Sequence, residues 1–207
     1  MATMILDPRM EQELRAQRAA WGGDRFDEVW EGVYMMSPLA DNEHQEIAAG
    51  LVAAIRNALG WNTSFRIFPG VNVSDRDRDW EHNYRCPDVA IFSTETKAKN
   101  CGTHWCGGPD FAIEITSPND RSREKFEFYS KVGVAELLII DRSTWTLELY
   151  RFVDGQLNLV ATSRAEGSTG EQLIESQILG VSLRMLPQKP RDAIEITAPG
   201  NGQKWLL

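Results

Sequence analysis

Apolar and polar residues alternate with two different periods along this chain. Apolar side chains recur every three or four positions from 47 to 59, which predicts an amphipathic helix with one face packed on a sheet. In 145–151 and 156–160 they recur at every second position, which predicts two strands, and Asp154-Gly155 between them is a hairpin signal. The chain therefore combines helices with strands.

Three helices are predicted by the residues at their ends. The first begins at Pro8 and stops near Gly22. The second begins at Asn42, which has a glutamine at capping-box spacing. The third follows a polar cap sequence at 117–120 and stops at Gly133.

Further strands are predicted by short apolar or alternating runs. The run 135–141 is continuously apolar except at its ends, as in a central strand covered on both faces. Residues 93–109 show no periodicity and predict a long loop. The remaining strands are expected within 26–36, where Gly32 marks a turn or a bulge, at 64–68, after 88 and at 111–116.

The order of these elements is typical of an α/β fold in which a mixed β-sheet is flanked by helices. With 207 residues, 42% hydrophobic and 25% charged, the chain has material for one well-packed domain. We divide it into an N-terminal helical segment (1–25), a main domain (26–186) and a loose C-terminal tail (187–207).

The chain shows no feature of a membrane or secreted protein. No window approaches the roughly 20 apolar residues that a membrane span needs, and no long apolar core follows positive charge at the N-terminus. Three cysteines are an odd number without framework spacing, which suits a reducing compartment. We therefore expect a cytoplasmic protein.

The charge balance limits the modes of nucleic-acid binding. A net charge of −8 excludes a general nucleic-acid coat, because an acidic protein gains nothing from non-specific attraction to phosphates. A local basic groove remains compatible with this total, with Arg85, Arg121 and Arg123 as candidate phosphate contacts. The alternative for this basic run, which acids interrupt, is a solvated helix face.

Two acidic residues, Asp88 and Glu114, stand among strongly apolar neighbours. A buried carboxylate without a partner loses its hydration, so a cation should lie between them. A hard divalent cation such as Mg²⁺ is one such partner. Ordinary salt bridges to Arg85 and Lys125 are the alternative.

Two carboxylates and a lysine are also a minimal set for phosphodiester hydrolysis. That reaction needs an acidified water, an electrophile for the non-bridging oxygen and an acid for the leaving oxygen, and a metal can supply all three. The sequence therefore favours Asp88, Glu114 and Lys125 as candidate catalytic residues.

Cys101, His104 and Cys106 are candidates for a second kind of metal site. With Cys86 or His82 they could in principle make a tetrahedral zinc site. Their spacing lacks the paired two-residue separations of zinc ribbons, so reduced thiols in a loop are the better interpretation.

An ordered series of short motifs resembles the Uma-type putative restriction endonucleases of bacteria, which belong to the PD-(D/E)xK nuclease superfamily. The similarity extends over about residues 26 to 152. The motifs are Met36-Ser37-Pro38 with His44, Cys86-Pro87-Asp88-Val89-Ala90, Gly108-Pro109-Asp110 running into 111–118, Lys125 with Tyr129, Gly133-Val134, and a strand ending in Asp141.

The resemblance implies a restriction-endonuclease-like core with a magnesium site where two strands diverge. Asp88 and Glu114 would ligate the metal together with the backbone carbonyl of Ile115. The superfamily triplet reads Glu-Ile-Thr here, so Thr116 stands in the usual lysine position. Lys125 matches the position at which Uma-type sequences carry a lysine, and it would orient the attacking water.

The polar first turn of the second predicted helix is the other candidate region. His44 and Glu46 could supply a further ligand or a hydrogen bond to a ligand. A histidine in a first helical turn more often caps or packs, and Tyr129 is expected to pack its helix on the sheet rather than to touch substrate.

The function expected from these observations is a metal-dependent endonuclease acting on DNA, with Mg²⁺ as cofactor, Mn²⁺ as its substitute, and a homodimer as the assembly that cuts both strands. The alternative is a catalytically silent nuclease-fold module for dimerisation or partner binding, which the acidic total and the missing triplet lysine favour.

Overall fold

The structure is a computed structural model that describes residues 3–61, 64–117, 120–165 and 173–207. A six-stranded mixed sheet forms its centre, with the strand order β13-β12-β11-β10-β7-β4. Only β10 and β11 run parallel within it. Its strands are β4 (Phe65–Pro69), β7 (Val89–Ser93), β10 (Phe111–Thr116), β11 (Glu136–Asp141), β12 (Thr146–Val153) and β13 (Gln156–Arg164).

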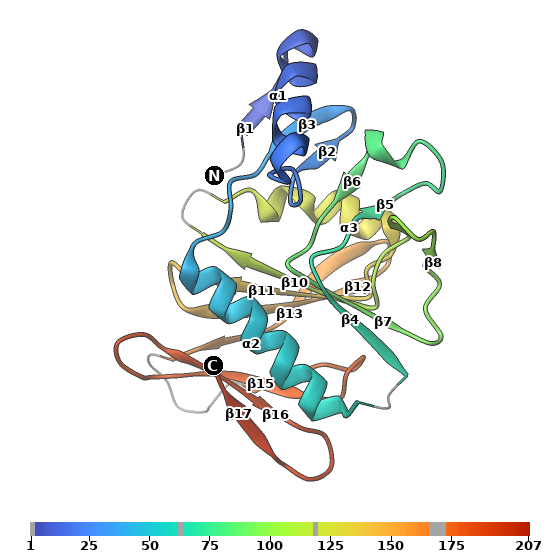
Figure 1. The fold of residues 1–207 in the computed structure, drawn as a ribbon. Helices are drawn as coiled ribbons and strands as arrows, with labels where there is room; N and C mark the ends of the chain where they lie inside the picture. The colour runs from blue at the N-terminus through green and yellow to red at the C-terminus, as the bar shows by residue number, and fades with distance from the viewer. Residues whose placement is uncertain (1–2, 62–63, 118–119, 166–172) are drawn as a thin grey trace.

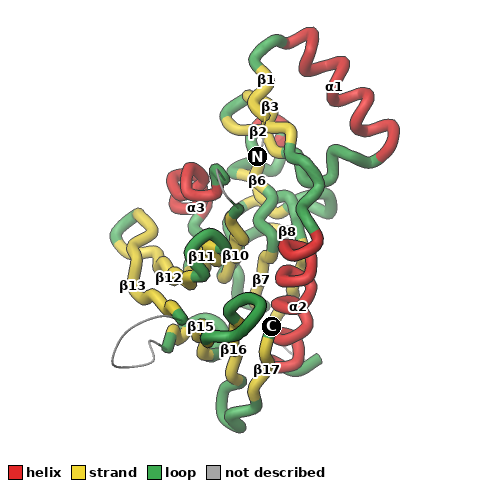
Figure 2. The backbone as a smooth tube through the Cα atoms, turned by 90° about the vertical axis from the view of Figure 1, so that its left-hand side faces the viewer, coloured by secondary structure: helices red, strands yellow, loops and turns green. Residues whose placement is uncertain are grey.

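Two helices cover opposite sides of strands β7 and β10 (Figure 2). Helix α2 (Asn42–Leu59) packs on one face. Its apolar stripe, which includes Ile47, Leu51 and Ile55, is buried against the sheet. Helix α3 (Phe126–Val132) follows a 3₁₀ turn, η2 (Ser122–Lys125), and packs the other face. The predicted mixed sheet with flanking helices is confirmed.

A second sheet carries the N-terminal part of the chain, and α1 (Pro8–Trp21) projects beside it (Figure 1). Strand β1 of the expected N-terminal segment pairs with β3 of the expected main domain. The sheet has the order β1-β3-β2-β6-β5-β9-β8. Its strands are β1 (Thr3–Ile5), β2 (Glu28–Trp30), β3 (Val33–Met36), β5 (Val73–Ser74), β6 (Tyr84–Arg85), β8 (Lys99–Asn100) and β9 (Trp105–Cys106). A 3₁₀ turn, η1 (Trp80–His82), precedes β6.

The residues expected to form a loose tail, 187–207, instead belong to a third sheet under α2 (Figure 1). Ile194 and Ile196 are fully buried in the same core as α2, and Gly50 of that helix lies against Leu207. The expectation of a loose tail is therefore wrong, since two segments within 187–207 pair as strands of this sheet. These strands are β14 (Ile174–Glu175), β15 (Ser182–Leu186), β16 (Ala193–Thr197) and β17 (Lys204–Leu206).

The expected long loop at 93–109 also differs from what is found. It contains the short strands β8 and β9, and Trp105 is buried with its ring stacked on Phe92 at a centroid distance of 3.8 Å. Two-residue strands leave no periodic signal in the sequence, so only the tertiary contacts reveal them.

The ends of the helices follow the expected chemistry with one change. Gly22 and Gly133 end α1 and α3 in the left-handed conformation. The cap of α2 is Asp41 rather than Asn42, because its carboxylate accepts a hydrogen bond from the backbone nitrogen of His44 at 2.8 Å. Two residues of the cap predicted for the third helix, 118 and 119, lie outside the described residues.

None of the helices in the described ranges is long and apolar enough to cross a bilayer.

Gly108 permits the contact between α3 and the segment that leads into β10. A Cβ atom there would lie 2.6 Å from the backbone nitrogen of Val134 and 2.9 Å from the carbonyl carbon of Gly133. We expect Gly108→Ala to lower the free energy of unfolding by about 2–3 kcal/mol in urea denaturation, because backbone must move. Gly22→Ala, which meets no atom within 4 Å, should cost only about 1 kcal/mol for its left-handed conformation.

Candidate active site

The site begins where β7 and β10 stop pairing. Their antiparallel ladder ends at the pair Val89 and Ile113, and the next residues are Asp88 and Glu114. An oxygen of Asp88, Oδ2, accepts a hydrogen bond from the backbone nitrogen of Ile115 at 2.7 Å. The Asp88 carboxylate therefore takes the place of the next ladder bond and holds the two strands apart.

This bond also orients the carbonyl group of Ile115. The N–H and C=O of one strand residue point to the same side of the strand. Because the N–H of Ile115 faces Asp88, its carbonyl oxygen faces the same opening. This agrees with the position expected of a backbone ligand.

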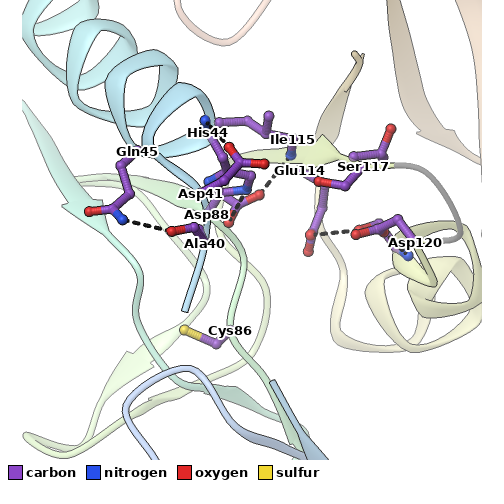
Figure 3. Close-up of polar contacts among 12 residues, drawn as sticks. Ala40, Asp41, His44, Gln45, Cys86, Asp88, Glu114, Ile115, Ser117 and Asp120 are labelled. Atoms are coloured by element: carbon purple, nitrogen blue, oxygen red, sulfur yellow. Dashed lines mark hydrogen bonds and ion pairs between the residues drawn. The ribbon is translucent and has the colours of Figure 1, made fainter. Parts of the chain in front are cut away.

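His44 is brought to the other oxygen of Asp88 by the start of α2. Its Nε2 lies 3.2 Å from Oδ1 of Asp88, and Figure 3 shows His44, Asp88 and Ile115 gathered at one place. Burial opposes the charged imidazole most strongly, but the hydrogen bond to Asp88 and the negative charges of Asp88 and Asp41 together raise the pKa of His44. His44 thus orients Asp88.

Arg142 fixes the start of α2 to the end of β10. Its guanidinium pairs with Asp41 at 2.9 Å and with Glu43 at 2.9 Å, and it also bonds the carbonyl of Thr116. The cap residue and the sheet are thereby joined by one side chain. This bridge sets the place from which His44 reaches Asp88.

Glu114 points to the α3 side of the sheet and is 2% exposed. The ammonium of Lys125 lies 3.0 and 3.1 Å from its two oxygens, and the hydroxyls of Ser122 and Tyr129 also donate to it. Tyr129 is fully buried against the sheet, as expected, and in addition holds this carboxylate.

The charges around Glu114 are incompletely balanced. Burial, together with the charges of Asp88 and Glu28, raises the pKa of Glu114 to about 8 against the opposing charge of Lys125. Burial works against the ammonium of Lys125, yet the charges of Glu114 and Glu28 raise the pKa of Lys125. Because a carboxylate must be deprotonated to ligate a metal, a cation that binds Glu114 displaces a proton from part of the population near neutral pH.

Glu28 is the site residue that the sequence did not predict. It lies on β2, is 4% exposed, and its Oε1 is 2.9 Å from the ammonium of Lys125. Its only sequence signal is an acid beside Val29 and Trp30 in a short strand. The pairing of β2 with β6, which no periodicity predicts, brings it beside the strand that ends before Asp88.

A cavity of about 490 Å³ opens on these groups. Its lining includes residues of α2 and of the segment before that helix, the carboxylates of the site and Arg121. The guanidinium of Arg121 pairs with Glu124 and lies 5.2 Å from the centroid of the Trp30 ring. Arg121 is the predicted phosphate contact that the fold places at the cavity.

The remaining predicted contacts lie elsewhere. Arg85 is 2% exposed, bonds the carbonyl of Val29 and stacks on aromatic rings, so it is a structural residue and not a phosphate contact. Arg123 pairs with Glu148 at 2.6 Å and does not line the cavity. Glu46 is exposed and pairs with Arg191 at 3.5 Å, so it does not reach Asp88 or its neighbours.

The donor set fits a hard divalent cation. Glu28, Asp88 and Glu114 place three carboxylates around the single ammonium of Lys125, and carboxylate oxygens are the ligands that a hard cation prefers. Within the described residues no group of three or more His, Cys, Asp or Glu side chains is arranged to hold a metal by itself. A site made of two carboxylates and the Ile115 carbonyl does not need three such side chains.

The three residues considered for a zinc site, Cys101, His104 and Cys106, lie in the segment that contains β8 and β9. Cys101 and Cys106 are free thiols, and His104 bonds the backbone carbonyl of Arg76.

The family follows from a comparison with known sequences. A family model described as Uma2, putative restriction endonuclease, matches residues 16–201. The chain belongs to this family. The Uma2 match confirms the resemblance seen in the motifs and extends it from about residues 26–152 to residues 16–201. No curated protein matches the chain.

A solved structure supports the Uma2 fold independently. It is a putative nuclease belonging to DUF820 from Anabaena variabilis, with a TM-score of 0.56 and 18% identity over 74% of this chain and 83% of that one. At this identity the similarity concerns the fold alone. The mixed sheet that separates at Asp88 and Glu114 is therefore built on a scaffold seen in another protein.

Proposed function

We propose that the chain is a metal-dependent endonuclease that hydrolyses phosphodiester bonds in DNA. The observation that carries this proposal is the convergence of Asp88, Glu114 and Lys125 where two strands separate, at a cavity of about 490 Å³. The family description points to the same reaction class. Thr116 occupies the position at which the superfamily usually has a lysine. Lys125, in the following 3₁₀ turn, supplies the ammonium instead.

Asp88, Glu114 and the carbonyl of Ile115 would hold Mg²⁺, with Mn²⁺ as a substitute. The cation would acidify a water and stabilise charge on the phosphate. Each protein group has its own task. Lys125 orients the attacking water and offsets charge on the phosphate, His44 fixes the rotamer of Asp88, and Arg121 attracts the backbone of the substrate.

A homodimer acting in the cytoplasm completes the proposal. Cutting both strands of a duplex requires two such centres, and a two-fold pair of subunits is the simplest way to supply them. Plasmid DNA incubated with the protein and Mg²⁺ should be converted directly to the linear form by a dimer. Accumulation of nicked circles would instead indicate that single centres act alone.

The competing function is a catalytically silent module of the same fold. It is favoured by one observation, that Lys125 already occupies both oxygens of Glu114. The two functions differ in metal binding, because a silent module has no reason to release that carboxylate.

Calorimetric titration with Mn²⁺ distinguishes them. We expect the wild-type protein to bind Mn²⁺ and Asp88→Asn to bind it at least tenfold more weakly, because a neutral amide replaces an anionic ligand. Asp110→Asn is the matched control, since Asp110 precedes β10 as Asp88 precedes β7, but its carboxylate accepts a hydrogen bond from the backbone nitrogen of Ser93 and does not line the cavity. Equal affinity in Asp88→Asn and wild type would reject the proposed site.

A further inference from the structure

Glu28 is the third carboxylate of the site, and both of its oxygens are already held. Oε1 accepts from the backbone nitrogen of Cys86 at 2.8 Å, and Oε2 accepts from the indole nitrogen of Trp30 at 2.6 Å. Cys86 stands two residues before Asp88, so the carboxylate is tied to the segment that delivers the proposed ligand. Glu28 is thus fixed in place and is poorly suited to ligate a metal directly.

Lys125 lies between this fixed carboxylate and Glu114. Its ammonium is 2.9 Å from Oε1 of Glu28 and 3.0 Å from the nearer oxygen of Glu114. The side chains of Lys125, Glu28 and Glu114 are 10%, 6% and 3% exposed, so little water competes for the ammonium. A buried lysine with two anionic partners can give up one of them and remain paired.

Glu114 needs such an exchange before it can ligate a cation. Each of its oxygens accepts a bond from Lys125 and a second bond from a hydroxyl, of Tyr129 on one oxygen and of Ser122 on the other. The ammonium and an incoming cation therefore compete for the same oxygens. Without a second partner for the ammonium, this competition would favour the ion pair between Lys125 and Glu114 over metal binding.

We propose that Glu28 is a positioning residue that retains the Lys125 ammonium beside the site when Glu114 turns to a metal ion. This inference rests on the proposed function. Glu28 acts through Lys125: it weakens the hold of Lys125 on Glu114, and it keeps the ammonium within reach of the phosphate after the exchange.

The test measures Mn²⁺ affinity by calorimetry in Glu28→Gln, Glu28→Asp and Lys125→Met. Both Glu28 variants should bind Mn²⁺ about tenfold more weakly than wild type, the usual size of an effect on a ligand's hydrogen-bonded partner. Glu28→Asp keeps the charge but withdraws the carboxylate by one methylene, so it separates position from charge. Thermal unfolding shows whether each variant is folded.

The decisive measurement places Glu28→Gln in the Lys125→Met background. Because Glu28 acts through the ammonium, its loss should then weaken Mn²⁺ binding by less than about threefold. A tenfold or larger loss in this background would show that Glu28 acts independently of Lys125 and would overturn the inference. Wild-type affinity in Glu28→Asp would reduce Glu28 to a source of negative charge, which also overturns it.

Glu195→Gln is the matched control for loss of a buried carboxylate. Glu195 is 8% exposed, pairs with Arg184 and Lys204, and lies in the C-terminal sheet. It should leave Mn²⁺ affinity unchanged. If wild-type protein binds no Mn²⁺, the proposed function and this inference fall together, whereas normal binding without a Glu28 effect rejects the inference alone.

Discussion

Replacing Glu114 by glutamine should reduce Mg²⁺-dependent DNA cleavage by at least about a thousandfold. The amide keeps the volume of the side chain but cannot supply an anionic ligand, and its NH₂ group would face donors. Glu114 accepts hydrogen bonds from Lys125, Ser122 and Tyr129. An NH₂ group cannot accept them, so at least one of these contacts must be lost. The measurement is the single-turnover cleavage rate with enzyme in excess over DNA.

Glu136→Gln is the control for this experiment. Glu136 is 1% exposed, lies on the neighbouring strand β11 and pairs with Arg151 at 2.8 Å, at the opposite end of β10 from Glu114. It should lower stability without lowering the cleavage rate of the folded protein. Cleavage by Glu114→Gln at the wild-type rate would remove Glu114 from the mechanism.

The two central carboxylates could be predicted because the residues next to them in the sequence are apolar. Asp88 precedes an apolar strand, and Glu114 sits inside one, so each required a partner wherever the chain placed them. The hairpin of β12 and β13 and the apolar stripe of α2 were predicted for the same reason, since their periods depend only on local sequence.

The partners of these carboxylates could not be predicted in the same way. Glu28 reaches Lys125 only because β2 pairs with β6 in a separate sheet. Arg85 carries a charge and stands three residues before Asp88, yet the fold buries it against Trp30 and Phe128. Which charged group faces the cavity depends on tertiary contacts between short strands, and a sequence pattern does not encode these contacts locally.

Lys125→Met should separate catalysis from metal binding. We expect the single-turnover cleavage rate to fall about a hundredfold or more, because no ammonium remains to orient the attacking water. Mn²⁺ affinity should stay equal or increase, since the group that occupies the oxygens of Glu114 is gone. A ligand variant such as Asp88→Asn has the opposite signature, with metal binding lost first.

The same substitution makes stability depend on the metal. Methionine matches the length of lysine but leaves Glu114 and Glu28 without their shared cation in a buried setting, so the apo variant should melt at a lower temperature than wild type. Adding Mn²⁺ should raise its melting temperature by more than it raises that of wild type, because the cation then supplies the missing positive charge. Lys131→Met is the matched control, since Lys131 is exposed and pairs only with Asp75. Wild-type cleavage by Lys125→Met would show that the buried lysine serves the fold and not the reaction.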